Sequence, residues 1–228
     1  IKKINHKYLN KTIYIPHGHY INNYFPYNNK LKQFYNIDNN DFVYMYFGQI
    51  RRYKNVELLI ETYLDSDIQK SSKLLIAGNP INNNIKNNLL KYENEKNIIF
   101  DLNFIENEKV FDLFKLADIL VFPFNIHKTL NSGSIYLSLS LAKPVISSEI
   151  GTIKDLKNKK YIFSYLYEKE DEHKDKLKEI LEKVYNKYAN NRNKLIEYGK
   201  IAKEDMEKYN NWEIVGNKIK RSYYDLIK

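Results

Sequence analysis

Short, uninterrupted runs of apolar residues alternate with segments of helical spacing along most of this 228-residue chain. The first run, Phe42–Phe47 (FVYMYF), is closed by Gly48, and the next segment, Val56–Leu64, places its apolar residues on one helical face. Further runs of this kind are Lys73–Ala77, Asn97–Phe100, Asp118–Phe122, Pro144–Ser147 and the shorter Tyr161–Phe163. Strands that are apolar throughout are typical of a parallel sheet covered by helices on both faces. We therefore expect an α/β fold with a doubly wound parallel sheet.

Helical segments are expected between these strands and after them. The spacing of apolar residues predicts helices at Asn82–Glu93, Glu106–Ala117 and Ser134–Ala142. The chain from about Glu170 to Lys228 is also helical and amphipathic, and we expect it to cap the sheet rather than form a separate domain. The first forty residues are irregular and rich in Asn, with one strand-like piece at Thr12–Ile15.

The composition excludes several classes of protein. No cysteine is present, which rules out disulfides, thiolate metal sites and a cysteine nucleophile and favours a reducing, cytoplasmic location. No apolar run reaches the roughly 18–20 residues of a membrane span. The net charge of +9 suits a phosphate-bearing partner, but the lysines are spread along the chain and are interpreted mainly as a solvated surface. Nucleic acid is not expected, because basic and aromatic residues do not alternate.

Two turns carry the residues that we interpret as a ligand site. In an open parallel sheet the ligand lies beyond the carboxyl ends of the strands. Gly48 ends the first strand and is followed by Arg51 and Lys54, whose positive charges suit a phosphate. After the fourth strand come Asn131, Ser132, Gly133 and Ser134, directly before a helix. These residues predict either a simple helix cap or an anion site made by the helix N-terminus.

Other motifs add little to this picture. Neither a G-x-G-x-x-G fingerprint nor a P-loop is present. Gly78 and Gly151 also follow strands, and for them a tight turn is a sufficient explanation. His17 and His19 have no further ligand at metal spacing, so no metal site is expected.

The chain resembles the C-terminal, donor-binding half of retaining GT-B glycosyltransferases of group 1. The matching stretches, in order, are YFGQIRRYKNVELLIETY, LLIAGNP, NIIF, ADILVFPF, LNSGSIYLSLSLAKPVISSEIGTIKDL and NNWEIVGNKIKRSYYDL. The opening IYIPHGHY is similar to the segment by which the chain enters this half. The resemblance implies that residues 1–40 are a linker from an N-terminal domain that this chain lacks, and that residues 41–228 are a Rossmann-like, nucleotide-sugar-binding domain with C-terminal helices. The first residue, Ile1, agrees with a fragment or a processed product.

The resemblance also implies roles for individual residues. Lys54 matches a lysine that binds the donor diphosphate, whereas Gln49 replaces the usual arginine. We expect Arg51 or, as the second choice, Arg52 to take over that role. Two family glutamates fall on Thr129 and Leu137, so both acids are missing. The remaining implied donor contacts are His17, Gly48, Asn131 and, around the base, Phe104 and Ile105.

The implied activity is transfer of a sugar, with retention, from a UDP- or GDP-linked donor to a saccharide or lipid-linked acceptor. Arg51, Lys54 and the amides of Ser132–Ser134 would stabilise the charge on the departing diphosphate, with no cofactor or metal required. No catalytic residue is assigned, because the acceptor side is expected in the N-terminal domain. Location at the inner face of the membrane, with peripheral membrane contact, is also implied.

Two other functions remain open at this point. The loss of both glutamates favours a non-catalytic nucleotide-binding or scaffolding module derived from the same family. The positive charge favours a membrane-surface or nucleic-acid binder, which would show a steep dependence on salt. As an isolated domain, the chain is expected to bind donor weakly and to transfer little sugar.

Overall fold

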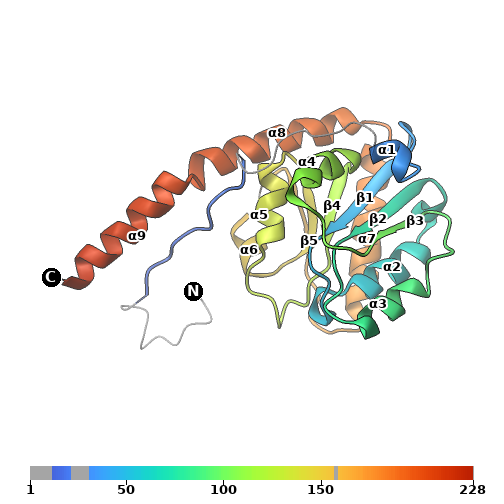
Figure 1. The fold of residues 1–228 in the computed structure, drawn as a ribbon, viewed down its shortest axis with the longest axis horizontal. Helices are drawn as coiled ribbons and strands as arrows, with labels where there is room; N and C mark the ends of the chain where they lie inside the picture. Colours follow the sequence, from blue (N-terminus) through green and yellow to red (C-terminus); the bar gives the residue numbers. More distant parts are fainter. Residues whose placement is uncertain (1–11, 22–30, 157–158, 228) are drawn as a thin grey trace.

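Six parallel strands form one sheet with the order β3-β2-β1-β4-β5-β6 (Figure 1). The computed structural model describes residues 12–21, 31–156 and 159–227. The strands are β1 (Phe42–Phe47), β2 (Ser72–Ala77), β3 (Ile98–Asp101), β4 (Ile119–Phe122), β5 (Val145–Ser148) and β6 (Ile162–Tyr165). The predicted doubly wound topology is confirmed. The bounds of β1 are as predicted, and the ends of the other strands differ from the prediction by at most two residues.

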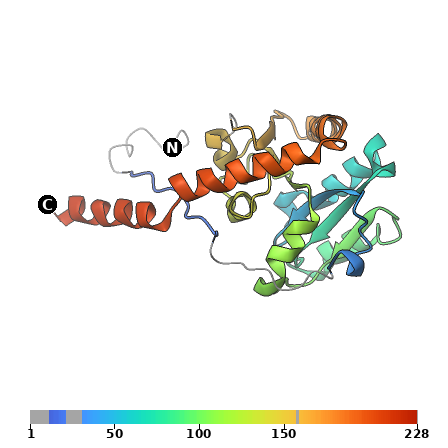
Figure 2. The same cartoon turned by 90° about the horizontal axis from the view of Figure 1, so that it is seen from above.

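Helices occupy the segments between the strands and the C-terminal part of the chain (Figures 1 and 2). Helix α2 packs against α7, and α5 packs against α8. The helices are α1 (Leu31–Phe34), α2 (Val56–Leu64), α3 (Asn83–Leu90), α4 (Asn107–Leu116), α5 (Gly133–Ser140), α6 (Gly151–Leu156), α7 (Glu172–Tyr188), α8 (Arg192–Tyr209) and α9 (Trp212–Ile227).

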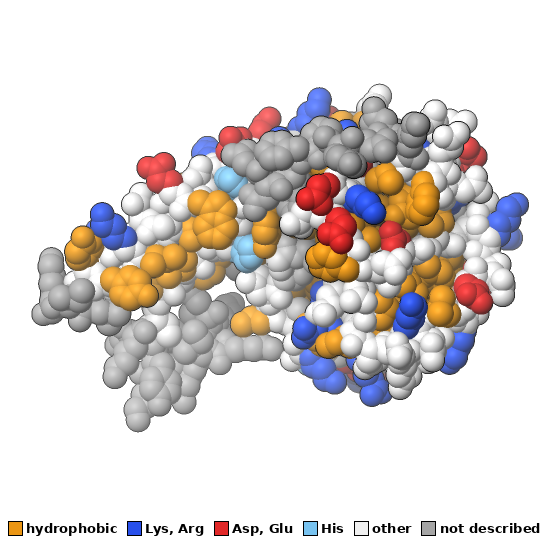
Figure 3. Space-filling view, in the orientation of Figure 1, with side chains coloured by type: hydrophobic (Ala, Val, Ile, Leu, Met, Phe, Trp, Pro, Cys, Tyr) orange, Lys and Arg blue, Asp and Glu red, His pale blue; other side chains and the backbone are white. Residues whose placement is uncertain are grey.

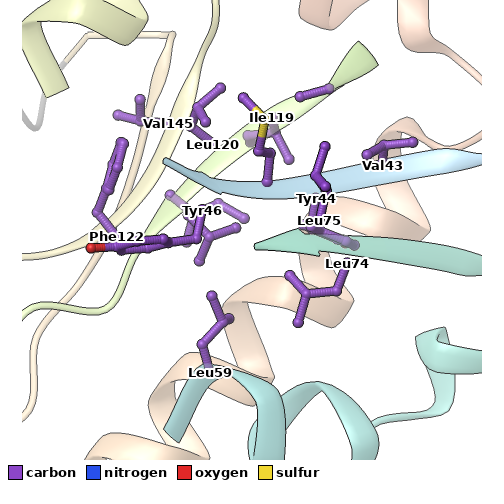
Figure 4. Packing of buried hydrophobic residues seen from close by; sticks show 14 of the residues in the cluster. Val43, Tyr44, Tyr46, Leu59, Leu74, Leu75, Ile119, Leu120, Phe122 and Val145 are labelled. Atoms are coloured by element: carbon purple, nitrogen blue, oxygen red, sulfur yellow. The ribbon is translucent and has the colours of Figure 1, made fainter. Parts of the chain in front are cut away.

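Strand β1 is apolar at every position because both of its faces are covered (Figure 4). On one face, the hydroxyl of Tyr44 donates to the carbonyl of Leu181 in α7 at 2.9 Å. On the other face, the ring of Phe47 meets that of Phe114 in α4 edge-on, with centroids 4.8 Å apart. Alternating residues of one strand therefore enter two different helix layers, which removes the polar-out positions of a half-exposed strand.

The C-terminal helices differ in how much they contribute to the core. Helix α7 buries apolar residues against the sheet, at β5 and β6, as expected. Helix α8 buries its apolar residues against the helices α5 and α7. Helix α9 runs on beyond the sheet (Figures 1 and 2), and Val215 is the one buried side chain among those described in it. Trp212 and Tyr223 are 54% and 64% exposed, and apolar side chains follow α9 in the space-filling view (Figure 3).

The N-terminal segment at residues 12–21 lies against the junction of α8 and α9. The backbone N–H of His19 donates to the carbonyl of Asn210 at 2.8 Å, and the indole Nε1–H of Trp212 donates to the carbonyl of His19 at 2.8 Å. Gly18 sits so close to the Trp212 ring that a Cβ on it would lie 2.4 Å from the indole.

The predicted strand at Thr12–Ile15 is wrong, because these residues have no regular secondary structure. A strand needs a neighbouring strand to pair with, and none of the described strands pairs with this segment. Its apolar residues Ile13 and Tyr14 stay exposed. The assignment of residues 1–40 as a linker to another domain stays a prediction. In the described part of the chain, no helix has the length and apolar character needed to span a membrane.

Candidate functional site

A cavity of about 420 Å³ lies at the carboxyl edge of the sheet, where the loops after β1 and β4 face each other. Strand β1 has β2 on one side and β4 on the other, so the chain changes its direction of winding at this point. This switch point is where open α/β sheets bind ligands. The cavity is lined by Tyr20, Gln49, Tyr53, Lys54, Phe124, Thr129, Asn131, Ser132, Gly133, Ser134 and Leu137.

Lys54 provides the positive charge of this lining. It ends a short 3-10 turn (Arg52–Lys54), and its ammonium lies 5.6 Å from the centre of the Phe124 ring. Burial, and then the charge of Arg51, lowers the pKa of Lys54 to about 8. In the part of the chain that the structure describes, it forms no ion pair with a carboxylate. A largely buried ammonium without a counter-charge is costly, and an anionic ligand would remove that cost.

Gly48 allows the Lys54 loop to approach α5. Its φ of +123° lies in the region that favours glycine, and a Cβ here would be 2.8 Å from Oγ of Ser134 and 3.8 Å from Nζ of Lys54. The predicted cation and the predicted helix N-terminus are therefore brought together across one glycine. Gly78 packs its Cα on the carbonyl of Gly48, which agrees with the purely structural role expected for it.

Helix α5 presents unpaired backbone donors to the cavity. Ser132 occupies the N-cap position, but its side chain makes no capping hydrogen bond. Among the described residues, the first-turn amides of Gly133 and Ser134 have no acceptor. The side chain of Asn131 is engaged locally, because its Oδ1 accepts the N–H of Ser132 at 2.9 Å and the hydroxyl of Thr152. The simple helix-cap interpretation of these residues therefore does not hold for Ser132, and the amides remain available to an anion.

Tyr20 lines the cavity near the start of α5, and His17 lies next to it. The ring of His17 stacks on that of Tyr136, with centroids 4.6 Å apart. Its Nδ1–H donates to the carbonyl of Gly18 at 2.6 Å, which leaves Nε2 to accept from the Tyr20 hydroxyl at 3.4 Å. A Cβ on Gly133 would lie 3.2 Å from that hydroxyl and 3.8 Å from Nε2 of His17. His17 thus lies beside the predicted anion site, behind Tyr20.

Five predicted contacts are not part of the cavity lining. Of these, His17 and Gly48 lie beside lining residues, as described above, and the other three are Arg51, Phe104 and Ile105. Arg51 is exposed, and its Nε donates to the side-chain oxygen of Gln49 at 2.9 Å. Phe104 is 69% exposed, whereas Ile105 packs partly into the core. The structure therefore places Arg51 at the rim and does not bring Phe104 or Ile105 to this cavity. Their proposed ligand roles remain predictions.

The lining also contains residues that sequence reasoning missed. Tyr20, Tyr53 and Phe124 line the cavity but carried no signal, because aromatic residues occur throughout this chain. Only their positions in the sequence could have indicated them, since Tyr53 directly precedes Lys54 and Phe124 follows β4 after a single proline. Aromatic walls of this kind are common in small-molecule sites.

Thr129 and Leu137 both line the cavity, so the absence of acids at these positions affects the site itself. No carboxylate belongs to the described lining. The Thr129 hydroxyl is buried and has no hydrogen-bond partner among the described residues. Within the same residues, no cluster of His, Asp or Glu is placed to hold a metal ion.

The fold is a doubly wound α/β domain of the GT-B type, with a cavity at the switch point of its sheet. The sequence profile of the family described as "Glycosyl transferases group 1" matches residues 28–202, which is most of the chain. The chain therefore belongs to the group 1 glycosyltransferase family, as the sequence predicted. A search of curated proteins finds no match to this sequence.

Solved structures confirm the fold. Sucrose-phosphate synthase from Thermosynechococcus elongatus matches with a TM-score of 0.73 and 18% identity, over 97% of this chain and 56% of that chain. HepE from Anabaena, solved with UDP and glucose, matches with a TM-score of 0.71 and 15% identity, over 92% of this chain and 56% of that chain. The C-terminal domain of LpcC, a group 1 family protein from Francisella tularensis, matches with a TM-score of 0.60 and 17% identity, over 82% of this chain and 96% of that chain. The chain spans a little over half the length of the first two proteins.

Proposed function

We propose that this domain binds the diphosphate of a UDP- or GDP-linked sugar in the cavity at the switch point. The observation that carries the proposal is the close approach of Lys54, a partly buried cation without a carboxylate partner among the described residues, to the unpaired amides at the start of α5. One fully charged donor and several oriented backbone donors suit a group with two adjacent phosphates. Support comes from HepE, a similar structure solved with UDP and glucose.

The reaction that we propose is transfer of the sugar, with retention, to a saccharide or lipid-linked acceptor. When the bond between the sugar and the diphosphate breaks, negative charge grows on the departing phosphate oxygen. Lys54 and the amides of Gly133 and Ser134 are already in place to stabilise that charge, so they need no rearrangement during the reaction. The proposed chemistry uses no cofactor besides the donor.

Calorimetric titration of the 228-residue chain with UDP, GDP, UMP and GMP tests this proposal. We expect one of the diphosphates to bind and the matching monophosphate to bind at least about tenfold more weakly, because it lacks the second phosphate that reaches Lys54. Equal affinity for mono- and diphosphates would contradict the proposed site. Because the chain spans about half of the larger structures that it matches, we expect it to transfer little sugar on its own.

A second candidate is a non-catalytic nucleotide-binding or scaffolding module. The observation that favours it is the lining itself, in which Thr129 and Leu137 stand at the edge of the cavity and no described residue offers a carboxylate. In the same titration, no binding of either UDP or GDP would favour the scaffold. Binding of one of them favours the donor site.

Contact with a membrane surface is a further part of the proposal. Helix α9 exposes Trp212, Ile219 and Tyr223, and it carries Lys218 and Lys220 at exposed positions. An amphipathic helix with aromatic and basic residues suits the surface of an anionic bilayer. Co-sedimentation with vesicles tests this contact: binding to anionic but not to neutral vesicles supports it, and no binding to either contradicts it.

A further inference from the structure

Three buried rings pack together behind the cavity, at the start of α7. Tyr165, Tyr167 and His173 are 7%, 1% and 1% exposed. The His173 imidazole stacks on the Tyr167 ring, with centroids 4.0 Å apart and planes 13° apart. Its Nε2 lies 2.8 Å from the hydroxyl of Tyr165. None of the three residues lines the cavity, so contact with a ligand does not explain a buried histidine at this place.

His173 reaches the loop after β1 through Asn55. Nδ1 of His173 lies 3.5 Å from Nδ2 of Asn55, the residue that directly follows Lys54. Because an amide nitrogen can only donate, Nδ1 is the acceptor and Nε2 carries the proton that it donates to Tyr165. Burial lowers the pKa of His173 to about 4, which keeps the ring in this neutral form at pH 7.

Asn55 itself holds a special backbone conformation. Its φ of 53° and ψ of 39° lie in the left-handed region, where Asn is better tolerated than most residues. This conformation ends the 3-10 turn that carries Lys54 and begins α2. The side chain of Asn55 therefore contacts His173 at the point where the direction of the Lys54 loop is set.

Tyr167 reaches the loop after β4. Its hydroxyl accepts the backbone N–H of Ile126 at 3.0 Å. Between the two loops, the N–H of Asn125 donates to the carbonyl of Tyr53 at 2.9 Å, and its side-chain Nδ2 donates to Glu170 at 2.6 Å. The loop after β1 and the loop after β4 are therefore bonded to each other and held from behind by the same cluster.

We propose that His173 is a positioning residue of the donor site: stacked on Tyr167 and in contact with Asn55, it fixes the spacing between the loop that carries Lys54 and the loop that leads to α5. The effect on ligand affinity rests on the proposed function, whereas the order of the two loops is a property of the free chain. Binding groups must be held within about 0.5 Å of their productive positions, which surface loops achieve only with packed support.

Four variants separate positioning from simple structural support. His173→Phe keeps a ring to stack on Tyr167 but removes both nitrogens. His173→Asn places an amide oxygen near the position of Nδ1 and restores the acceptor. Asn55→Gly deletes the amide while the left-handed backbone remains unstrained. The control is Tyr63→Phe, which removes a buried hydroxyl that donates to Ser72 at 2.7 Å, far along α2 from the cavity.

Two measurements on the full 228-residue chain are compared, namely amide hydrogen exchange at residues 48–55 and 123–131 and the Kd for UDP and GDP. We expect His173→Phe and Asn55→Gly to speed exchange in both loops and to weaken nucleotide binding by about tenfold, which corresponds to about 1.4 kcal/mol. His173→Asn should restore most of the affinity, and the His173→Phe, Asn55→Gly double variant should bind no more weakly than either single variant. Tyr63→Phe should lower Tm without changing amide hydrogen exchange in either loop.

The outcomes distinguish the two proposals. Unchanged exchange in both loops, or the same change in the Tyr63→Phe control, would overturn the role of His173. Faster exchange in both loops of the His173→Phe variant, together with a wild-type chain that binds neither nucleotide, would support the bracing and overturn the proposed function. Weaker binding in His173→Phe with rescue by His173→Asn would support both.

Discussion

The two walls of the cavity offer positive charge in different ways. The loop after β1 contributes the full charge of Lys54, on a long side chain that is largely removed from water. The wall made by α5 contributes the partial charges of backbone N–H groups at Gly133 and Ser134, which are fixed by the helix and do not titrate. The attraction of the first wall for an anion is therefore strong but depends on pH, whereas that of the second wall is weaker and does not change with pH. For a diphosphate lying between the two walls, Lys54 would supply most of the binding energy and the amides of α5 would fix the orientation.

We expect the largest effect on stability and nucleotide affinity from a substitution that disturbs the close approach of the two walls. Gly48→Ala places a Cβ 2.8 Å from Oγ of Ser134 on a strained backbone with φ of +123°, so the Ser134 hydroxyl must rotate away or the loop must shift away from α5. We expect a loss of about 1–3 kcal/mol in stability, and a fall of about 100-fold in affinity for UDP or GDP, as a shift of about 1 Å produces. Chemical denaturation and calorimetry measure the two effects.

Gly216→Ala is the matched control for this change. Gly216 lies in α9 with nothing within 4 Å of its added Cβ, and the same substitution there should stabilise the helix by up to about 1 kcal/mol. Its nucleotide affinity should equal that of the wild type. If Gly48→Ala behaves in the same way as Gly216→Ala, the two walls do not depend on Gly48 for their contact.

Removing the charge of one wall should have the next largest effect. Lys54→Met keeps the apolar length of the side chain beside Phe124 but loses a charge-assisted hydrogen bond to the diphosphate. We expect affinity to fall about 30-fold, the equivalent of about 2 kcal/mol. Stability should stay the same or rise, because a partly buried ammonium without a carboxylate partner among the described residues is removed. Lys86→Met, on the exposed side of α3, is the control and should change neither quantity.

The pH dependence of nucleotide binding distinguishes the contributions of the two walls without a mutation. The pKa of Lys54 is lowered to about 8, so the free site loses its charge as the pH rises through 8, while the amides of α5 do not change. A phosphate has already lost its second proton near pH 6, so the ligand charge is constant in this range. Affinity should fall by about tenfold between pH 7 and pH 9 in the wild type. It should be flat in Lys54→Met, and a slope that persists there would assign the titration to another group.

Arg51 should produce the smallest effect, because it lies at the rim. Arg51→Ala should weaken nucleotide binding about threefold at low salt, and the difference should vanish at high salt, where exposed charges are screened. The charge of Arg51 also lowers the pKa of Lys54. The fall in affinity with pH should therefore begin at a higher pH in this variant. A loss above tenfold that salt does not reduce would instead show direct contact with the diphosphate.

The same contrast explains which parts of the site could be predicted. The backbone features of the site could be predicted from the sequence. Gly48 directly follows an apolar strand and Ser132 directly precedes a helix, and these are the positions at which a parallel sheet turns. Lys54 was accessible because a cation stands out at the ligand edge of the sheet. The aromatic wall was not, since Tyr53 and Phe124 resemble many other aromatic residues of this chain until the loops are folded.

Side-chain direction in loops explains the remaining differences. Arg51 and Lys54 are three residues apart on one turn, yet Arg51 is exposed and Lys54 is partly buried, and no periodicity fixes this difference. Phe104 follows β3 at the predicted edge but projects into solvent. The strands were predictable throughout because burial on both faces leaves a continuous apolar pattern. The stripe on α9 predicted a helix but not the surface that would cover it.

The contact between residues 17–20 and the α8–α9 junction makes the cavity sensitive to movement far from the sheet. Asn210 and Trp212 hold the carbonyls of His17 and His19 by hydrogen bonds of 2.7 and 2.8 Å. His17 and Tyr20 in turn flank Gly133, at the first turn of α5. A rotation of α9 about Asn210 would therefore displace His17 and Tyr20 and, through them, the first turn of α5. Movement of the exposed helix would change the shape of the cavity.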